Sequence, residues 1–272
     1  MEAATASGGL VESLNAKVYG NGSETLVLAH GYGLDQSVWH YVLPDLMRHF
    51  KVVVYNLAFS GKVGSHVYDP KKYSSYYGYA EDLQNLLDEL HLDKVIFIGH
   101  SMAAMIGCIA ATQRPDVFKH LILICGSPRY INEKDYNGGF ETSDVEGVFA
   151  AIQHDYNGWC QNFAPVVIGA NDPKAIEEYK DTLASMEPVI ALDVARTIFL
   201  GDYRNILHEV KVPCTIIQSE KDFEVPLSVV DYMKGKLGDH TRVEIMETEG
   251  HTPMLTDHAM LLKVLKKVLG LN

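Results

Sequence analysis

The sequence predicts an α/β fold, in which a mainly parallel, doubly wound sheet carries a helical insertion over one edge. Short apolar runs rich in β-branched residues alternate with longer amphipathic segments along most of the chain, which favours strands joined by right-handed helical crossovers. This alternation stops between residues 141 and 200, where helical segments follow one another without a convincing strand, and then resumes. The chain has 272 residues, of which 47% are hydrophobic, enough for one large core with an inserted subdomain.

The first half of the chain contains the expected strands of one side of the sheet. A Gly-Asn-Gly-Ser turn at 20–23 joins the first two strands, and a glycine-rich loop at 30–33 follows the second. The segment 56–73 holds glycine, serine, proline and several charges, which indicates a surface loop. Strands are expected at 16–19, 24–29, 51–55, 95–99 and 121–125, and helices at 36–49, 76–90 and 101–113.

Residues 141–200 form the insertion, which glycines and prolines divide into four short helices. Because ligands bind beyond the carboxyl ends of parallel strands, where the insertion leaves and re-enters, we expect it to act as a lid. We interpret the chain as one domain over 16–272, preceded by a flexible N-terminus over 1–15. The helix breaks are expected at Gly158, Pro165, 169–171, Pro173 and Pro188. The alternation resumes with strands at 214–218 and 242–246, a helix after Pro226 and a closing helix over 258–269.

Charge and composition exclude several classes of partner and site. With 23 basic and 35 acidic residues the formal net charge is −12, which argues against nucleic acid or an anionic membrane surface as the main partner. The first nine residues lack the basic and apolar regions of a secretory signal, and no apolar run reaches transmembrane length, so we expect a soluble intracellular protein. The four cysteines show no C-x-x-C spacing and are interpreted as buried free thiols. No cluster indicates a metal and no glycine-rich phosphate motif indicates a nucleotide, so no cofactor is expected.

The stretch 95–105 contains the most specific local motif of the chain. Its apolar run turns sharply at Gly99, and the small and apolar residues after Ser101 favour a buried helix. A serine between a strand and a helix is typical of the nucleophile elbow, written G-x-S-x-G, although Ala103 stands at the second glycine position. The alternative is that Ser101 only caps the helix.

Two later strand ends supply the partners that a nucleophilic serine needs. Asp222 and His251 each follow one of the last two expected strands, so both lie at the carboxyl edge of the sheet. The chain order Ser101, Asp222, His251 is that of the α/β-hydrolases. In that arrangement His251 takes the serine proton, and Asp222 orients the imidazole and stabilises the imidazolium.

The oxyanion hole is expected to use the backbone N–H groups of Tyr32 and Met102. Tyr32 belongs to the glycine-rich loop and Met102 opens the helix after the elbow, so both approach the serine. Of the other ionisable candidates, Glu220 and Glu224 are interpreted as solvated and His30 and His100 as structural. His258 is interpreted as a surface cap at the start of the last helix.

Several short segments are more specific than the catalytic order alone. They are H-G-Y-G at 30–33 followed by D-Q-S-V-W at 35–39, G-H-S-M at 99–102, S-P-R-Y at 127–130, D-Y-N-G-G-F at 135–140 and A-P at 164–165. Together they resemble the plant receptor-hydrolase family of dwarf-type strigolactone receptors and karrikin-insensitive-type butenolide receptors. The similarity runs from about residue 16 to the C-terminus, and the S-P-R-Y and Y-x-G-G-F segments are specific to this family rather than to hydrolases in general.

The resemblance implies a butenolide receptor with slow serine-hydrolase activity, in which Ser101 attacks the ligand and His251 can retain a product. It also implies that the lid docks an F-box protein and a repressor targeted for degradation. We expect a monomer, the default oligomeric state, in the cytoplasm and nucleus. The sequence departs from the family at Tyr32 and at Ala184, where phenylalanine is common. We therefore expect a wider pocket at Ala184.

An apolar aromatic pocket is expected between the lid and the upper rim of the sheet, as a small lactone requires. The residues assigned to ligand contact are Tyr32, Tyr130, Phe140, Trp159, Phe163, Ala184, Phe199 and Ser219. The alternative is that some of these aromatic residues, Trp159 above all, only pack lid helices on one another.

Two other functions stay open on the residues alone. One is an ordinary carboxylesterase or C–C hydrolase for a small hydrophobic substrate, which fast turnover without product retention would favour. The other is a non-catalytic binding module on a hydrolase scaffold. The presence of Ser101, Asp222 and His251 together argues against the binding module.

Overall fold

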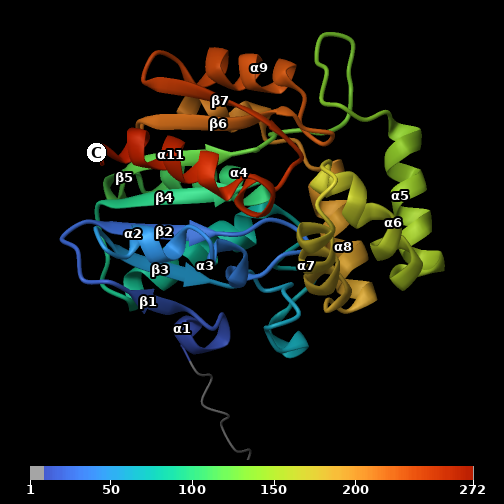
Figure 1. The fold of residues 1–272 in the computed structure, drawn as a ribbon, viewed down its shortest axis with the longest axis horizontal. Coiled ribbons are helices and arrows are strands. Elements are labelled where there is room, and N and C mark those ends of the chain that lie inside the picture. The colour runs from blue at the N-terminus through green and yellow to red at the C-terminus, as the bar shows by residue number, and fades with distance from the viewer. Residues whose placement is uncertain (1–8, 272) are drawn as a thin grey trace, which may run out of the picture.

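The computed structural model describes residues 9–271, and in this part of the chain seven strands form one sheet with helices on both faces (Figure 1). The strand order is β1-β3-β2-β4-β5-β6-β7. All neighbouring strands are parallel except β1, which is antiparallel to β3. The predicted doubly wound α/β fold is confirmed. The strands are β1 (Lys17–Tyr19), β2 (Thr25–Ala29), β3 (Lys51–Tyr55), β4 (Val95–His100), β5 (Phe118–Ile124), β6 (Cys214–Lys221) and β7 (Thr241–Glu249).

β1 and β2 follow each other in the chain but are not neighbours in the sheet. β3 lies between them, antiparallel to β1 and parallel to β2. Every residue of β2 is buried, which requires a strand on each side and cover on both faces, whereas β1 is an edge strand with exposed residues. The predicted turn at 20–23 therefore joins two strands without forming a hairpin.

Two helical layers cover the sheet. The helices outside the lid are α1 (Leu10–Ser13), α2 (Leu43–Leu46), α3 (Tyr76–Glu89), α4 (Met102–Gln113), α9 (Leu227–Leu237), α10 (Pro253–Thr256) and α11 (His258–Leu269), with 3₁₀-helices η1 (Gln36–Trp39), η2 (Ser65–Val67), η3 (Pro115–Val117) and η4 (Arg204–Glu209). On one face α3 packs along α4, which is buried over almost its whole length. On the other face α11 lies beside α2, where Lys266 pairs with Asp45 at 3.0 Å (Figure 1).

The insertion at 141–200 forms four helices beyond the carboxyl ends of the strands (Figure 1). They are α5 (Thr142–His154), α6 (Tyr156–Ile168), α7 (Pro173–Ala184) and α8 (Pro188–Leu200). Gly158 and Pro165, predicted as breaks, lie inside α6. The chain breaks at Asp155 instead, because its carboxylate accepts the N–H of Gly158 at 3.0 Å and so caps the start of α6.

The single helix predicted over 36–49 is wrong. The segment forms η1 and the short helix α2, separated by an irregular stretch. Pro44 lies in the first turn of α2 and has no N–H to donate to the preceding turn, so the apolar periodicity cannot continue as one α-helix.

The folded domain begins before residue 16. Residues 1–8 of the predicted flexible N-terminus lie outside the described residues. Beyond them α1 is tied to α3, because the N–H of Leu10 donates to the Glu89 carboxylate at 2.7 Å, and Leu14 is buried in the core.

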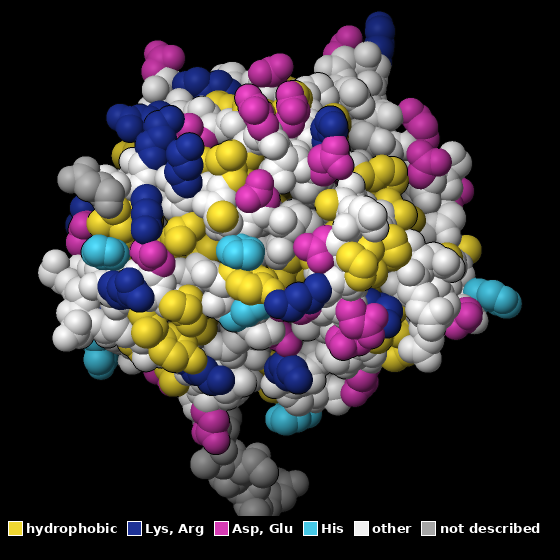
Figure 2. All heavy atoms as spheres, viewed as in Figure 1, with side chains coloured by type: hydrophobic (Ala, Val, Ile, Leu, Met, Phe, Trp, Pro, Cys, Tyr) yellow, Lys and Arg dark blue, Asp and Glu magenta, His cyan; other side chains and the backbone are white. Residues whose placement is uncertain are grey.

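The surface seen in Figure 2 carries acidic and basic side chains interspersed with small hydrophobic patches, one of them over the lid helices. Large apolar side chains that stay exposed on the lid include Val166, Val189 and Leu200. Among the helices of residues 9–271, none combines the length and apolar character needed to cross a bilayer.

Candidate active site

Ser101 lies at a sharp turn between β4 and α4. Its backbone angles are φ 57° and ψ −124°, in the region that non-glycine residues rarely adopt. The N–H of Ser101 donates to the carbonyl oxygen of Ile124 at the end of β5, at 2.8 Å, which holds the turn against the sheet. This is the geometry of a nucleophile elbow, in which the serine hydroxyl projects from the carboxyl edge.

Small residues around the elbow leave room for this turn. A Cβ at Gly99 would lie 2.5 Å from the carbonyl oxygen of Ala103, and a Cβ at Gly31 would lie 2.8 Å from the Cβ of Ser101. The glycine-rich loop therefore runs directly over the serine. The methyl group of Ala103, at the second glycine position of the motif, is accommodated in the core.

The structure brings Ser101, His251 and Asp222 into one hydrogen-bonded chain. Nε2 of His251 lies 2.8 Å from Oγ of Ser101, and Nδ1 of His251 lies 2.9 Å from Oδ2 of Asp222. The side chains of Asp222 and His251 are almost completely buried, and Ser101 is buried as well. The three residues come from the ends of β6, β7 and β4, as their chain order predicted.

The carboxylate of Asp222 is held by more than His251. Its Oδ1 accepts the N–H groups of Glu224 and Val225 at 2.8 and 3.2 Å, and its Oδ2 accepts Nε2–H of Gln218 at 2.9 Å. Burial alone would raise the pKa of this carboxyl, but the charge of His251 and these hydrogen bonds outweigh burial and lower it. Asp222 is therefore ionised at neutral pH and fixes the imidazole ring.

Glu224 is not solvated, contrary to the prediction. It is only 8% exposed, and its Oε2 lies 3.3 Å from Nε2 of His251. Burial favours the neutral form of His251, but the carboxylates of Asp222 and Glu224 outweigh burial and raise the pKa of His251 to about 9. The other acidic candidate, Glu220, is exposed as expected.

His30 and His100 hold loops in place. Nε2 of His30 accepts the N–H of Leu57 at 3.0 Å, so its Nδ1 donates to the carbonyl oxygen of Gly31 at 2.8 Å. Nε2 of His100 donates to the carbonyl oxygen of His251 at 2.8 Å. Burial lowers the pKa of His30 to about 4 and of His100 to about 3, so both rings are neutral. Their interpretation as structural residues agrees with these contacts.

The predicted oxyanion donors lie on either side of Ser101. Met102 is the first residue of α4, where backbone N–H groups have no partner within the helix. Tyr32 follows Gly31 in the loop that crosses the serine. The hydroxyl of Tyr32 donates to the carbonyl oxygen of Ala191 on α8 at 2.9 Å, so this side chain ties the loop to the lid.

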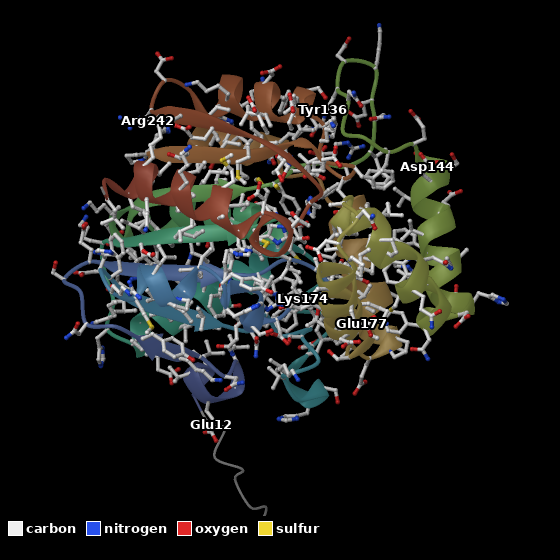
Figure 3. All side chains as sticks on the ribbon, in the orientation of Figure 1. Glu12, Tyr136, Asp144, Lys174, Glu177 and Arg242 are labelled. Carbon is white, nitrogen blue, oxygen red and sulfur yellow. The ribbon has the colours of Figure 1, made fainter. Side chains whose placement is uncertain are left out.

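Three of the predicted ligand contacts, Phe140, Trp159 and Phe163, line a pocket of about 550 Å³ between α5, α6 and the loop after β6. Asp144, labelled in Figure 3 at the start of α5, and the exposed Phe223 also line this pocket. The Phe163 ring stacks on Trp159 with centroids 4.6 Å apart. The centroid of the Trp159 ring also lies 6.4 Å from that of Tyr32, so packed aromatic rings connect the wall of this pocket to the loop that crosses the elbow.

Two predicted ligand contacts lie deeper. Tyr130 and Phe199 are buried and meet edge to face, with ring centroids 5.4 Å apart. The Tyr130 hydroxyl is buried and has no hydrogen-bond partner within the described residues. Burial first, and then the charge of Glu224, raise the pKa of this hydroxyl, while the nearby hydroxyl of Ser101 lowers it. Tyr130 is therefore a neutral donor beside the serine.

Two further predicted contacts, Ala184 and Ser219, are not among the residues that line this pocket. Ala184 ends α7 and is exposed, whereas its neighbour Leu183 is buried. Ser219 is completely buried within β6, with its hydroxyl 3.8 Å from Sγ of Cys125. It packs below the triad rather than in the pocket.

Cys125, Asp222 and His251 place three potential metal-ligand atoms within 4.8 Å of one another. Two of these residues already bind each other in the triad. Burial, followed by the charge of Asp222, raises the pKa of the Cys125 thiol well above its usual value. A protonated thiol is a poor metal ligand, so we assign this cluster to the triad and its supporting core. All four cysteines are buried and free.

The sequence pattern that defines the alpha/beta hydrolase fold matches residues 24–257. Strigolactone esterase D14 from Arabidopsis thaliana is 44% identical over 260 residues, which are 96% of this chain and 97% of the relative. The chain belongs to the α/β-hydrolase family, in its strigolactone esterase and karrikin receptor branch. The predicted resemblance is thereby confirmed.

Other members and neighbours of the α/β-hydrolase family agree with this assignment. Karrikin insensitive 2 receptor CA from Petunia hybrida is 44% identical over 259 residues, covering 94% of this chain and 96% of the receptor. Among solved structures, a hydrolase from Oleispira antarctica superposes with a TM-score of 0.93 at 34% identity, covering 97% of both chains. An enol-lactonase from Burkholderia xenovorans has a TM-score of 0.82 at 16% identity, a likeness of fold alone.

Sequence reasoning missed Glu224 as a residue of this α/β-hydrolase site. Charged residues in a loop are usually solvated, so Glu220 and Glu224 received the same interpretation. The available signal was the apolar setting of Glu224, between Phe223 and the Val225-Pro226 pair that starts α9. A carboxylate two residues after the triad acid lies close enough to share its histidine.

Proposed function

We propose that this protein is a butenolide receptor, for a strigolactone-like or karrikin-like ligand, with slow serine-hydrolase activity. The observation that carries the proposal is the hydrogen-bonded chain from Ser101 through His251 to Asp222, placed beneath an aromatic lid. The two relatives at 44% identity are a strigolactone esterase and a karrikin insensitive receptor, which supports both the chemistry and the ligand class.

In the proposed reaction Nε2 of His251 accepts the proton of Ser101 as Oγ attacks the ester carbonyl of the ligand. The backbone N–H groups of Tyr32 and Met102 stabilise the oxyanion that forms. His251 then donates its proton to the leaving oxygen, and water hydrolyses the acyl-serine by the same steps in reverse order. Asp222 keeps the productive tautomer of His251 and stabilises its cationic form.

The lid supplies the binding surface in this proposal. Phe140, Trp159 and Phe163 offer apolar rings to the ligand, and the unpartnered hydroxyl of Tyr130 offers a donor beside Ser101. This combination fits a small, largely apolar lactone with a few oxygen acceptors.

As a receptor, the protein would pass the signal to protein partners through the lid. We propose an F-box protein and a repressor as these partners, recognised by a monomer in the cytoplasm and nucleus. The exposed apolar side chains of Val166, Val189 and Leu200 on lid helices are available for such contacts.

The proposal is tested by incubating the wild type and Ser101→Ala with a synthetic strigolactone analogue. We expect the analogue to raise the melting temperature of both proteins and the wild type alone to release the hydrolysis product, measured by chromatography. Release without a melting shift at fast turnover would indicate an ordinary small-ester hydrolase. Equal release by Ser101→Ala would refute the assigned nucleophile.

A further inference from the structure

His251 has a carboxylate at each ring nitrogen. Asp222 accepts from Nδ1 at 2.9 Å, as a triad requires. On the other side, Nε2 lies 2.8 Å from the hydroxyl of Ser101 and 3.3 Å from Oε2 of Glu224. The serine and a second carboxylate therefore compete for the nitrogen that has to act as the base.

The local backbone forces Glu224 into this position. The two N–H groups bound to Oδ1 of Asp222 come from Glu224 and Val225, so the chain turns tightly around the triad carboxylate. This turn directs Phe223 outward, where it is 56% exposed, and leaves Glu224 8% exposed. Val225 is buried directly behind it, which fixes the direction of the turn.

Few charges face this pair. Burial, which raises the pKa of Glu224, outweighs the lowering by His251, and Asp222 raises it further. No lysine or arginine of the described residues contributes to the pKa shift of either Glu224 or His251. The other titratable groups around the pair are neutral: the His100 ring, the Cys125 thiol and the hydroxyls of Tyr32, Tyr76, Tyr130 and Tyr179.

The position of one proton decides whether Nε2 can act as a base. If the proton lies on Nε2, the ring is an imidazolium facing the Glu224 carboxylate. If it lies on Glu224, the carboxyl donates to Nε2. In both cases the lone pair of Nε2 is occupied and cannot accept the proton of Ser101. The reactive form appears only when this proton leaves, and it then places two carboxylates around a neutral ring in a water-poor site.

We propose that Glu224 is a positioning residue that acts through His251, holding a proton between its carboxylate and Nε2 and thereby slowing serine activation at neutral pH. The inference deepens the proposed function and rests on its serine-hydrolase chemistry. It assigns the slow turnover expected of a receptor to one identified side chain.

The sign of the effect follows from the pKa of His251, which is raised to about 9. Below this pH the His251–Glu224 pair mostly keeps its proton, so Nε2 cannot act as a base. Above it the neutral ring of His251 is the major form. Hydrolysis by the wild type should therefore rise with pH until it levels off above about 9. Removing the charge of Glu224 removes one of the two interactions that retain the proton, so the acid limb of the profile should move to lower pH.

The experiment is the pH profile of kcat/KM for p-nitrophenyl acetate, measured for the wild type and Glu224→Gln, with Ser101→Ala as the blank for spontaneous hydrolysis. Because each unit of pKa is a factor of ten in the population of the base, we expect a rise of about tenfold or more at pH 7 in Glu224→Gln. The two profiles should converge at high pH. A purely structural role for Glu224 would instead lower the plateau without moving the limb.

Glu220→Gln is the matched control. It removes the same charge from an exposed side chain at the end of β6, and its profile should superpose on that of the wild type. A wild-type acid limb near the ordinary histidine pKa, unchanged in Glu224→Gln, would overturn the inference.

A second readout does not depend on activity. The titration of His251 can be followed by NMR of ring carbon Cε1, with the resonance assigned by its loss in His251→Gln. A raised pKa in the wild type that falls in Glu224→Gln supports the inference even if no ester or butenolide is hydrolysed, in which case the proposed function alone has failed. An ordinary pKa in the wild type overturns the inference even if hydrolysis is observed.

Discussion

The carboxyl edge of the sheet and the lid that covers it are held in different ways. At the edge, Ser101 and His251 each follow a strand, and hydrogen bonds join them to one another and to Asp222. The lid is packed mainly through aromatic rings, such as the Trp159–Phe163 stack. The difference shows that the chemistry is fixed by the rigid sheet, whereas ligand selection depends on side-chain shape in the lid.

The two regions meet at the histidine loop. The N–H of His251 donates to the carbonyl oxygen of Val167 in the last turn of α6, at 2.9 Å. Gly250, with φ +91°, packs against the carbonyl oxygen of Ile168 in the same turn. A displacement of the end of α6 would therefore move His251, the catalytic base.

The largest loss of activity should come from a substitution at the carboxyl edge of the sheet. Ser101→Ala removes the nucleophile, and we expect kcat for any ester to fall by about 10⁴-fold or more, as for other serine hydrolases that lose a triad member. Ligand binding, followed by the shift in melting temperature, should persist because the lid is unchanged. Loss of binding together with activity would show that edge and lid are not separable.

The junction between the histidine loop and the last turn of α6 should give the next largest effect, on both stability and kcat. In Gly250→Ala the new Cβ would lie 1.8 Å from the Ile168 carbonyl oxygen, at a φ that disfavours alanine. We expect a loss of about 1–3 kcal/mol in the free energy of unfolding, measured by urea denaturation, and a lower kcat because His251 is displaced.

The matched control for the junction is Gly235→Ala. This glycine lies in α9 with open space where a Cβ would lie, so alanine should raise the free energy of unfolding by about 0.5–1 kcal/mol. A loss of stability in the control equal to that in Gly250→Ala would remove the argument for a tight junction.

A smaller effect is expected within the lid. Phe163→Ala removes a half-buried ring from the pocket, which should weaken ligand binding by about 1 kcal/mol, or roughly fivefold. Calorimetry with the butenolide analogue measures this change. Turnover of p-nitrophenyl acetate, which is too small to need the pocket, should stay unchanged; a parallel loss would place Phe163 in the catalytic arrangement.

The smallest effect should come from Ala184→Phe. Because residue 184 is exposed at the end of α7, the new ring should change ligand affinity by less than about 0.5 kcal/mol. A large change, measured by the same calorimetry, would show that the end of α7 reaches the pocket in solution.

The sheet and the triad could be predicted because their signals are local. The elbow around Ser101 is a contiguous run of residues, and Asp222 and His251 each follow a strand that is recognisable from its own apolar residues. The burial of Glu224 could not be predicted in this way, because it depends on a turn built around Asp222 within the folded loop.

The lid was predicted less well than the sheet. One residue along an α-helix turns a side chain by about 100°, so the step from the buried Leu183 to the exposed Ala184 lies within the error of any assigned helix phase. The break near Pro44 was missed for a simpler reason. The prediction of one helix relied on the apolar periodicity of this segment and neglected the proline, which has no N–H to donate to the preceding turn.

The most direct test of the butenolide-hydrolase account is the intact mass of the protein after incubation with the strigolactone analogue. The account predicts that the wild type gains the mass of a ligand fragment, mapped by peptide analysis to Ser101 or His251, and that Ser101→Ala gains none. An adduct of equal yield on Ser101→Ala, or one mapped outside the triad, would contradict the account.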